Sequence, residues 1–238
     1  MEAILMNHET SIRRKILEMH YRRQTAHIGS SLSCVEILTA VFSGKVMHDR
    51  FIMGKGHAAT ALYAALNEFG YSINLDDYDG EKLGYHASRC NGNDWSTGSL
   101  GHALSVGAGM ALAGRATIVV MGDGETDEGS VWEAARFAAD RNLNLVTIID
   151  CNGLKGYGAA ERPIVLESMF CAFGWHAAIV GGHNVDAIRR ALESETRPLA
   201  IIAMTIKGKG VSFMEGDNKW HYKSPNEEEY KKALGELE

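Results

Sequence analysis

The sequence predicts an α/β fold, with a doubly wound parallel sheet flanked by helices. Short apolar runs rich in β-branched residues alternate along the chain with longer stretches whose apolar residues recur at helical spacing. Such alternation is typical of β–α–β units with right-handed crossovers. The 238 residues show no internal repeat and no linker, so we expect a single domain over residues 1–238.

The first elements are expected to be two helices, a strand and a third helix. Apolar spacing predicts helices over residues 11–23 and 34–42, joined by a short polar turn that includes the SSLS segment. The apolar run 50–53 predicts a strand, which stops at a Gly-Lys-Gly-His turn before an alanine-rich helix over 58–66. Residues 70–98 are rich in Asp, Asn, Gly and Ser and predict a long surface loop, a feature that is often functional.

Helices and strands are expected to alternate through the rest of the chain. The predicted helices cover 101–113, 130–139, 165–173 and 185–192, and the predicted strands cover 117–121, 143–149, 177–180 and 199–204. A loop is expected from residue 151 to about residue 163. The tail that starts at Lys207 opens with glycine and lysine residues and should end in a charged helix.

Composition and charge exclude several classes of function. The net charge of −6, with no block of Lys or Arg, argues against nucleic-acid or anionic-membrane partners and favours a small soluble substrate. The four cysteines form no CxxC pair, which argues against a zinc site or a disulfide framework and favours a reduced compartment. No apolar run approaches ~20 residues, and the N-terminus lacks the order of a signal peptide. A soluble, cytoplasmic protein is therefore expected.

Two polar residues follow successive predicted strands. Asp123 lies between glycines after the strand 117–121, and Asn152 follows the next strand, 29 residues later. Ligands of open parallel sheets bind beyond the carboxyl ends of the strands, and carboxylate and amide oxygens suit Mg²⁺ or Ca²⁺. The alternative is that Gly-Asp-Gly is only a turn and Asn152 only a cap or loop residue. No GxGxxG or GxxxxGK[ST] supports a dinucleotide site or a P-loop.

The segments around these residues resemble a known family. GDGETDEGSVWEAARFAA, followed by LVTIIDCNGL, is similar to the thiamine-diphosphate motif of transketolases. HIGSSLSCVEILTAVF, DRFIMGKGHAATALYAAL, STGSLGHALSVGAGMALA and IKGKGVSFMEGDNKWH resemble the N-terminal half of that family in the same order, above all its split, two-gene members. The resemblance covers nearly the whole chain. It implies the diphosphate domain of the thiamine-diphosphate-binding fold and transfer of a two-carbon ketol unit from a ketose, often a phosphate ester, to an aldose.

The resemblance also implies which residues hold the cofactor. Asp123, Asn152 and the backbone carbonyl of Leu154 would bind Mg²⁺ or Ca²⁺, which holds the diphosphate of thiamine diphosphate. Gly124 would offer its backbone N–H to the diphosphate, and further cofactor contacts would come from His57, Gly98, Leu100, Gly122, Glu125 and His221.

Four histidines and two glutamates match positions that the family uses near the reacting atoms: His27, His57, His86, His221, Glu128 and Glu133. Histidines can donate and accept protons near neutral pH, as ketol transfer requires. His27 could instead cap a helix, and the chain after His86 is shorter than the family pattern. Glu128, which with Glu133 matches interface positions linked to proton transfer, would also be favourable near a helix N-terminus through the helix dipole alone. His102, His176 and His183 are expected to be structural.

Three departures from the family pattern bear on the substrate rather than the cofactor. Gly54 replaces a common Ser before Lys-Gly-His, Ala26 replaces a common Gly before His27, and the segment between Phe42 and Arg50 is short. None of them removes a predicted metal ligand.

A second polypeptide is expected to complete the enzyme. In the family a pyrimidine-binding domain supplies the glutamate that activates the cofactor, and basic residues that grip a sugar phosphate; neither has a matching position here. A separate subunit should provide them in an assembly of two copies of each chain. Alternatives are another thiamine-diphosphate reaction, such as 2-oxo acid decarboxylation or deoxyxylulose phosphate synthesis, an inactive scaffold, or a nicotinamide-binding protein. The histidines and the WEA segment favour ketol transfer, and retention of Asp123 and Asn152 argues against the scaffold.

Overall fold

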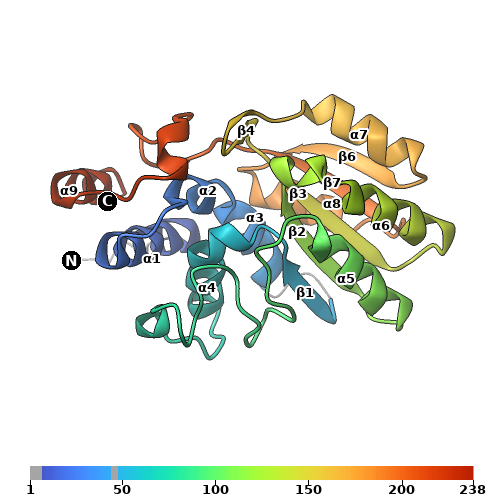
Figure 1. Ribbon diagram of the computed structural model, residues 1–238, viewed down its shortest axis with the longest axis horizontal. Helices are drawn as coiled ribbons and strands as arrows, with labels where there is room; N and C mark the ends of the chain where they lie inside the picture. Colours follow the sequence, from blue (N-terminus) through green and yellow to red (C-terminus); the bar gives the residue numbers. More distant parts are fainter. Residues whose placement is uncertain (1–6, 44–47, 238) are drawn as a thin grey trace.

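Five parallel strands form the central sheet of the computed structural model, which describes residues 7–43 and 48–237 (Figure 1). Their order across the sheet is β1 (Arg50–Met53), β2 (Thr117–Gly122), β3 (Leu145–Cys151), β7 (Leu199–Met204) and β6 (His176–Gly181). Every residue of β2 and β3 is buried. The two strands are mostly apolar because helices cover both of their faces. The predicted α/β fold is confirmed.

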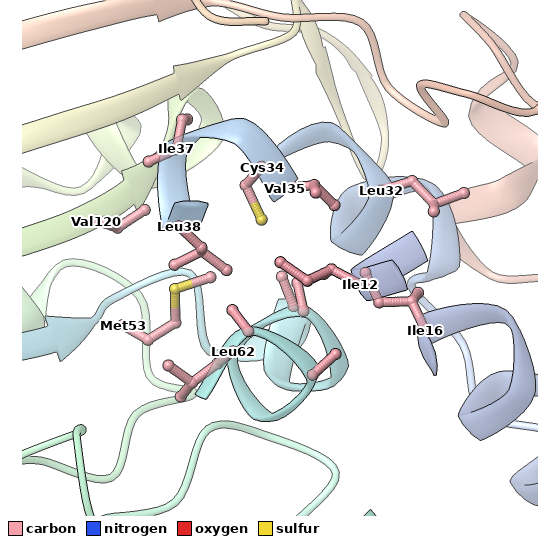
Figure 2. Packing of buried hydrophobic residues seen from close by; sticks show 14 of the residues in the cluster. Ile12, Ile16, Leu32, Cys34, Val35, Ile37, Leu38, Met53, Leu62 and Val120 are labelled. Atoms are coloured by element: carbon pink, nitrogen blue, oxygen red, sulfur yellow. The ribbon is translucent and has the colours of Figure 1, made fainter. Parts of the chain in front are cut away.

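Helices lie on both faces of this sheet, and alternate strand residues divide between two hydrophobic clusters. Ile118 and Val120 of β2 point into a cluster with the first four helices and α8, whereas Val119 and Met121 point into one with α5, α6 and α7. Figure 2 shows part of the first cluster. The helices are α1 (His8–Arg23), α2 (Ile28–Ser33), α3 (Val35–Phe42), α4 (Ala59–Glu68), α5 (His102–Leu112), α6 (Gly129–Asp140), α7 (Pro163–Ala172), α8 (Val185–Leu192) and α9 (Glu227–Glu236).

The predicted polar turn at SSLS is wrong. Residues of this segment form the buried helix α2, and the turn lies just before it, where Gln24 and His27 have φ values of 50° and 78°. The buried serine hydroxyls of α2 have acceptors inside the protein. Ser31 Oγ donates to the His27 carbonyl over 3.2 Å, and Ser33 Oγ donates to the buried carboxylate of Asp150. Serine hydroxyls that are hydrogen-bonded in this way can be buried. A buried helix that contains three serines lacks apolar periodicity, so the sequence pattern did not indicate it.

The long loops mostly match the prediction. Residues 70–98 contain only the short 3₁₀ helix η2 (Leu75–Asp77) as regular helix or strand, and the loop after β3 carries a small hairpin of β4 (Leu154–Lys155) and β5 (Gly158–Ala159). The charged helix predicted for the tail is α9, which packs on α1 with Tyr230 stacked on Tyr21 at 4.3 Å between ring centroids. No helix within the described ranges 7–43 and 48–237 has the length and apolar character needed to cross a membrane.

A buried histidine on α1 should make the stability of the fold depend on pH. His20 is 1% exposed, and its ring contacts the Thr25 carbonyl and Thr60 Oγ1, each at 2.9 Å. Burial lowers the pKa of His20 to about 4. Because the folded-state pKa lies below the unfolded value, the contribution of His20 is complete above about pH 6.5 and is lost as the pH falls towards 4.

We therefore expect His20→Gln to flatten the pH dependence of unfolding. Between pH 7 and pH 4 the variant should lose about 3 kcal/mol less stability than the unmodified chain, since each pKa unit corresponds to about 1.4 kcal/mol. Urea unfolding at both pH values measures this difference, and all other titrating groups are common to the two chains. Equal losses in both chains would contradict the assignment.

Candidate active site

A pocket of about 310 Å³ lies at the carboxyl ends of β1, β2 and β3. Almost all of the site residues predicted from the sequence line it: His27, His57, His86, Gly98, Leu100, Gly122, Asp123, Gly124, Glu125, Glu128, Asn152, Leu154 and His221. Glu133 is the exception, because its side chain is exposed on α6 outside the pocket. Seven separate segments of the chain therefore converge at this edge of the sheet.

The two polar residues that follow β2 and β3 are brought together as the strand order predicts. Gly122 pairs with Asp150 in the parallel register, so the residues just beyond them share one edge. Asp123 begins the 3₁₀ helix η3 (Asp123–Asp127), and its carboxylate accepts from the backbone N–H of Gly153 over 2.7 Å. The carboxylate thus reaches across to the loop that carries Asn152.

The donors at this edge fit a divalent cation. Asp123 offers a carboxylate, Asn152 an amide oxygen and Leu154 a backbone carbonyl, all hard oxygen ligands of the kind that Mg²⁺ and Ca²⁺ prefer. A cationic group already lies there, since Lys207 Nζ is 3.3 Å from the Leu154 carbonyl oxygen. Over residues 7–43 and 48–237 there is no cluster of three His, Cys, Asp or Glu side chains, so a cation here would need this mixed set.

Electrostatics at Asp123 also favour a bound cation. Burial and the nearby Asp150 carboxylate raise the pKa of Asp123, while hydrogen bonds from Gly153 and Gly124 oppose the rise. The Gly124 N–H, predicted to face a diphosphate, donates to Asp123 Oδ1 over 2.8 Å in this structure. Positive charge near this carboxylate would relieve the cost of its burial.

The four predicted histidines form a cluster in the pocket. The His27 ring centroid lies 4.9 Å from that of His221, 5.3 Å from that of His57 and 6.1 Å from that of His86. His57 lies in the 3₁₀ helix η1 (Gly56–Ala58) and His221 in η4 (Asn218–His221). His86 therefore joins the cluster although the chain after it is short.

Three of these histidines are neutral at pH 7. Burial, with the charges of neighbouring His and Lys side chains, lowers the pKa of His27 to about 4 and that of His221 to about 3. Burial and Lys55 lower the pKa of His57 well below its ordinary value. His27 is the N-cap residue of α2, yet its side chain makes no capping hydrogen bond, so the helix-cap alternative is wrong for its ring. A neutral imidazole in this pocket can accept a proton.

The remaining histidines lie outside this pocket. His102 is exposed at the start of α5, and His176 is exposed at the start of β6. His183 bonds to the Glu36 carboxylate over 2.9 Å and accepts from the Ile206 N–H over 2.8 Å. The structural role expected for these three histidines stays a prediction.

Close backbone contact explains why glycines surround the pocket. A Cβ on Gly56 would lie 2.7 Å from Thr97 Oγ1 and 2.9 Å from the Gly98 nitrogen. The segment that carries Gly98 and Leu100 therefore packs directly on the turn after β1, and Thr97 Oγ1 fastens it by donating to the Met53 carbonyl over 2.5 Å. A side chain at Gly56 would move this wall of the pocket.

Glu125 presents an unsatisfied atom beside the pocket. Its Oε1 accepts from the Gly101 N–H over 3.0 Å, but its Oε2 is buried without a partner in this structure. Burial raises the pKa of Glu125 to about 7. An unpaired buried polar atom is costly, so a bound group that donates to Oε2 would be favoured.

Sequence reasoning missed Lys207, a buried cation beside the pocket residues Leu154 and His221. It is 1% exposed, and Nζ lies 2.7 Å from Asn218 Oδ1 and 2.9 Å from His221 Nδ1. Burial and Lys55 lower the pKa of Lys207 to about 8. Because the ammonium group can only donate, His221 Nδ1 accepts and the imidazole proton sits on Nε2, which lies on the Gly156 side of the pocket. The sequence signal that could have indicated Lys207 was the segment of lysine and glycine residues at the start of the tail.

Sequence reasoning also missed the buried pair of Lys55 and Asp150, which are 2% and 0% exposed. Lys55 was interpreted only as part of a turn. Asp150 sits at the end of an apolar run, where a charge is unexpected and was itself the available signal.

Fold and pocket together define a class of enzyme domain that binds an anionic cofactor at the carboxyl ends of parallel strands. Comparison with known proteins supplies the family. Residues 115–237 match the family profile described as "Transketolase, thiamine diphosphate binding domain", and residues 2–157 match that described as "1-deoxy-D-xylulose-5-phosphate synthase". The chain belongs to the transketolase family, because relatives of that family match it along its whole length.

Two such relatives are subunits of split enzymes. The chain is 38% identical to an apulose-4-phosphate transketolase subunit from Phocaeicola vulgatus, over 94% of this chain and 90% of that one. It is also 38% identical to 6-deoxy-6-sulfo-D-fructose transketolase subunit SqwG of Clostridium sp. strain MSTE9, over 100% of this chain and 98% of that one. Human transketolase is 36% identical over 84% of this chain but only 36% of its own length.

Solved structures support the fold. Transketolase from Pichia stipitis superposes with a TM-score of 0.87 at 23% identity, covering 97% of this chain and 40% of its own. Transketolase from Campylobacter jejuni superposes with a TM-score of 0.84 at 25% identity, covering 97% of this chain and 42% of its own. The chain thus spans about two fifths of these solved transketolases.

Proposed function

We propose that this chain is the N-terminal, cofactor-anchoring subunit of a split thiamine-diphosphate-dependent transketolase. The enzyme would transfer a two-carbon ketol unit from a ketose or ketose phosphate to an aldose. The observation that carries the proposal is the pocket in which the oxygens of Asp123, Asn152 and Leu154 lie beside four clustered histidines. The naming of full-length relatives as transketolase subunits supports the same assignment.

The oxygen donors and cations of the pocket would hold the cofactor by its diphosphate. Asp123, Asn152 and the Leu154 carbonyl would bind Mg²⁺ or Ca²⁺, and Lys207 would add a second positive charge beside them. When bound, thiamine diphosphate supplies a thiazolium carbon that can act as a nucleophile towards a ketose carbonyl.

The histidines would perform the proton transfers with the sugar. The neutral ring of His221 presents an N–H at Nε2, because Lys207 occupies Nδ1, and can donate to a sugar oxygen. His27 and His57 are also neutral at pH 7 and can accept a proton from a sugar hydroxyl as the C2–C3 bond breaks. His86 completes this wall of the pocket. Glu128 lines the pocket and is exposed, so it is accessible to a partner chain. Glu133 is proposed to lie at the subunit interface.

Lys207→Met should weaken cofactor binding. The loss of a buried positive charge beside the diphosphate is expected to raise the dissociation constant of thiamine diphosphate about tenfold to a hundredfold, as for other charge-assisted contacts. Lys209→Met is the matched control. Lys209 does not line the pocket, and its Nζ forms an ion pair with Glu215 Oε1 at 3.1 Å. Calorimetric titration of thiamine diphosphate with Mg²⁺ into each variant, assembled with the partner subunit, measures the two dissociation constants. An equal dissociation constant for the Lys207 variant and the control would contradict the role.

We also propose that residues 1–238 form a single diphosphate-binding domain and that a separate subunit carries the pyrimidine-binding domain. That subunit would supply the glutamate that activates the cofactor, and the basic residues that bind a sugar phosphate. Two copies of each chain would form an α2β2 assembly in the cytoplasm. Support comes from relatives that are named as subunits and match this chain over 90% and 98% of their own length.

Reconstitution tests the proposed function. The chain, mixed with the product of a neighbouring pyrimidine-domain gene, thiamine diphosphate and Mg²⁺, should transfer ketol units from a ketose donor to an aldose, and neither chain alone should do so. The match of residues 2–157 to deoxyxylulose phosphate synthases makes that reaction the second candidate. Pyruvate with an aldose phosphate distinguishes the two, because release of CO₂ in place of ketol transfer would overturn the proposal.

A further inference from the structure

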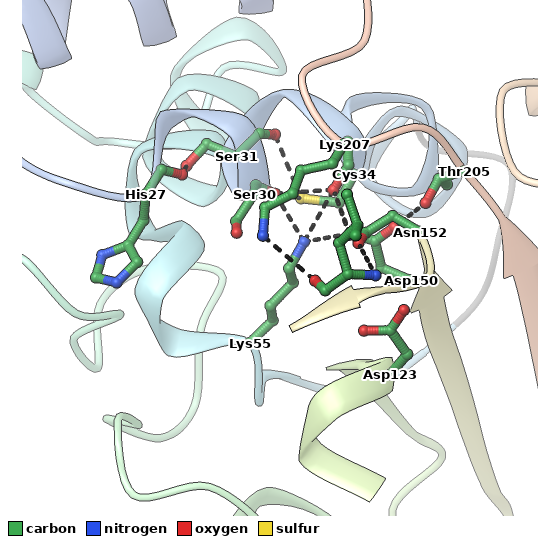
Figure 3. A network of polar contacts seen from close by, with 12 residues as sticks. His27, Ser30, Ser31, Cys34, Lys55, Asp123, Asp150, Asn152, Thr205 and Lys207 are labelled. Carbon is green, nitrogen blue, oxygen red and sulfur yellow. Dashed lines mark hydrogen bonds and ion pairs between the residues drawn. The ribbon is translucent and has the colours of Figure 1, made fainter. Parts of the chain in front are cut away.

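A buried polar cluster lies directly beneath the proposed metal ligands. Lys55, which follows β1, forms an ion pair with Asp150 of β3, and α2 contributes Ser33. Thr205, which follows β7, donates to Asp150 from the other side. Figure 3 shows Lys55 and Asp150 meeting close to Asn152 and Asp123. Ion pairs this deeply buried are weak evidence for stability, because the cost of taking both charges out of water offsets their attraction.

The hydrogen-bond inventory of the cluster fixes the direction of each bond. The Asp150 carboxylate can only accept, and its Oδ2 lies 2.5 Å from Ser33 Oγ. Ser33 has one proton, which goes to this charged carboxylate rather than to the neutral Ser30 carbonyl 3.0 Å away. Lys55 Nζ can only donate, and it lies 3.0 Å from Ser33 Oγ. Ser33 is therefore held as an acceptor towards any further neighbour.

That further neighbour is Asn152. Its Nδ2 lies 3.4 Å from Ser33 Oγ, and its Oδ1 accepts from the Leu154 N–H over 3.1 Å. An acceptor at Ser33 attracts the NH₂ side of the amide and turns the oxygen away, towards the loop that Asp123 also contacts. A donor at Ser33 would select the opposite orientation and present an NH₂ group, which repels a cation.

We propose that Lys55, Asp150 and Ser33 are positioning residues that orient the Asn152 amide with its oxygen towards the metal. This inference rests on the proposed function, because it assigns Asn152 as a metal ligand. The Asp150 carboxylate accepts the Ser33 hydroxyl proton, and Lys55 balances the charge of Asp150. Ser33 Oγ is then left as an acceptor for the Asn152 NH₂ group. Outer partners of this kind typically change metal affinity 10–100-fold when they are removed.

Two matched variants test this role in the full chain assembled with its partner subunit. Ser33→Ala and Thr205→Val each remove one hydroxyl that donates to Asp150, but only Ser33 contacts Asn152. The dissociation constant of Mn²⁺, measured by electron paramagnetic resonance with saturating thiamine diphosphate, should rise at least tenfold for Ser33→Ala and less than threefold for Thr205→Val. Equal changes in the two variants would overturn the inference.

A second arm separates orientation from general disruption. Asn152→Asp replaces the amide by a carboxylate with two equivalent oxygens, for which there is no orientation to select. Adding Ser33→Ala to Asn152→Asp should therefore change the Mn²⁺ dissociation constant less than threefold. A full tenfold loss in this background would overturn the inference. Failure of the unmodified assembly to bind Mn²⁺ with thiamine diphosphate would instead overturn the proposed function, and the inference with it.

Discussion

Asp123→Asn is expected to raise the dissociation constant of thiamine diphosphate with Mg²⁺ at least a hundredfold and to abolish ketol transfer by the assembled enzyme. The substitution keeps the size of the side chain but removes the one negative charge among the three proposed ligands. Loss of a charged metal ligand of this kind removes several kcal/mol of binding free energy. The fold should persist, because burial already opposes ionisation of Asp123. Calorimetric titration and a coupled ketol-transfer assay measure the two effects.

The control for this prediction is Asp140→Asn. Asp140 is exposed at the end of α6, and its ion pair with Arg136 has a long separation of 3.9 Å. Cofactor affinity of this variant should equal that of the unmodified chain. The account fails if Asp123→Asn binds the cofactor within threefold of the control.

Lys55→Met is expected to cost about 3–5 kcal/mol of folding free energy, because it leaves the Asp150 carboxylate buried without its counter-ion. Asp150→Asn removes that charge, so the double variant should be more stable than Lys55→Met alone by at least about 2 kcal/mol. Urea unfolding of the two single variants and the double variant measures this coupling. Strictly additive losses would show that the two charges do not depend on each other.

An exposed ion pair provides the comparison for this prediction. Lys231 and Glu227 form an i,i+4 pair on α9, and both side chains are about two-thirds exposed or more. Lys231→Met should change the unfolding midpoint little, since exposed pairs contribute little to stability. A loss as large as that of Lys55→Met would indicate a general effect of removing lysine.

The sheet and the proposed metal ligands could be predicted because they follow from local patterns. β2 and β3 are buried and mostly apolar, and residues that follow neighbouring parallel strands meet at one edge. The strand-end rule placed Asp123 and Asn152 together, but it left open that they are only turn and loop residues; the family resemblance indicated their role as metal ligands, and that of Leu154. The four histidines come from segments with no common local pattern, so their meeting was indicated only by the family resemblance.

Other features could not be predicted because they depend on tertiary partners. The SSLS segment looks like a turn, since Ser33 reaches its carboxylate acceptor, Asp150 of β3, only once α2 is buried in the fold. Lys55 and Asp150 look misplaced in sequence and make sense only as a pair. Glu133 lies outside the pocket of this chain, and the interface role proposed for it needs a second subunit.

The most direct test of the central claim is a calorimetric titration of thiamine diphosphate with Mg²⁺ into the chain alone and into its mixture with the pyrimidine-domain subunit. The account predicts tight binding only in the mixture, with one cofactor for each copy of this chain, and loss of that binding when a chelator removes the metal. Absence of binding in the mixture, or binding that survives both the chelator and Asp123→Asn, would contradict it.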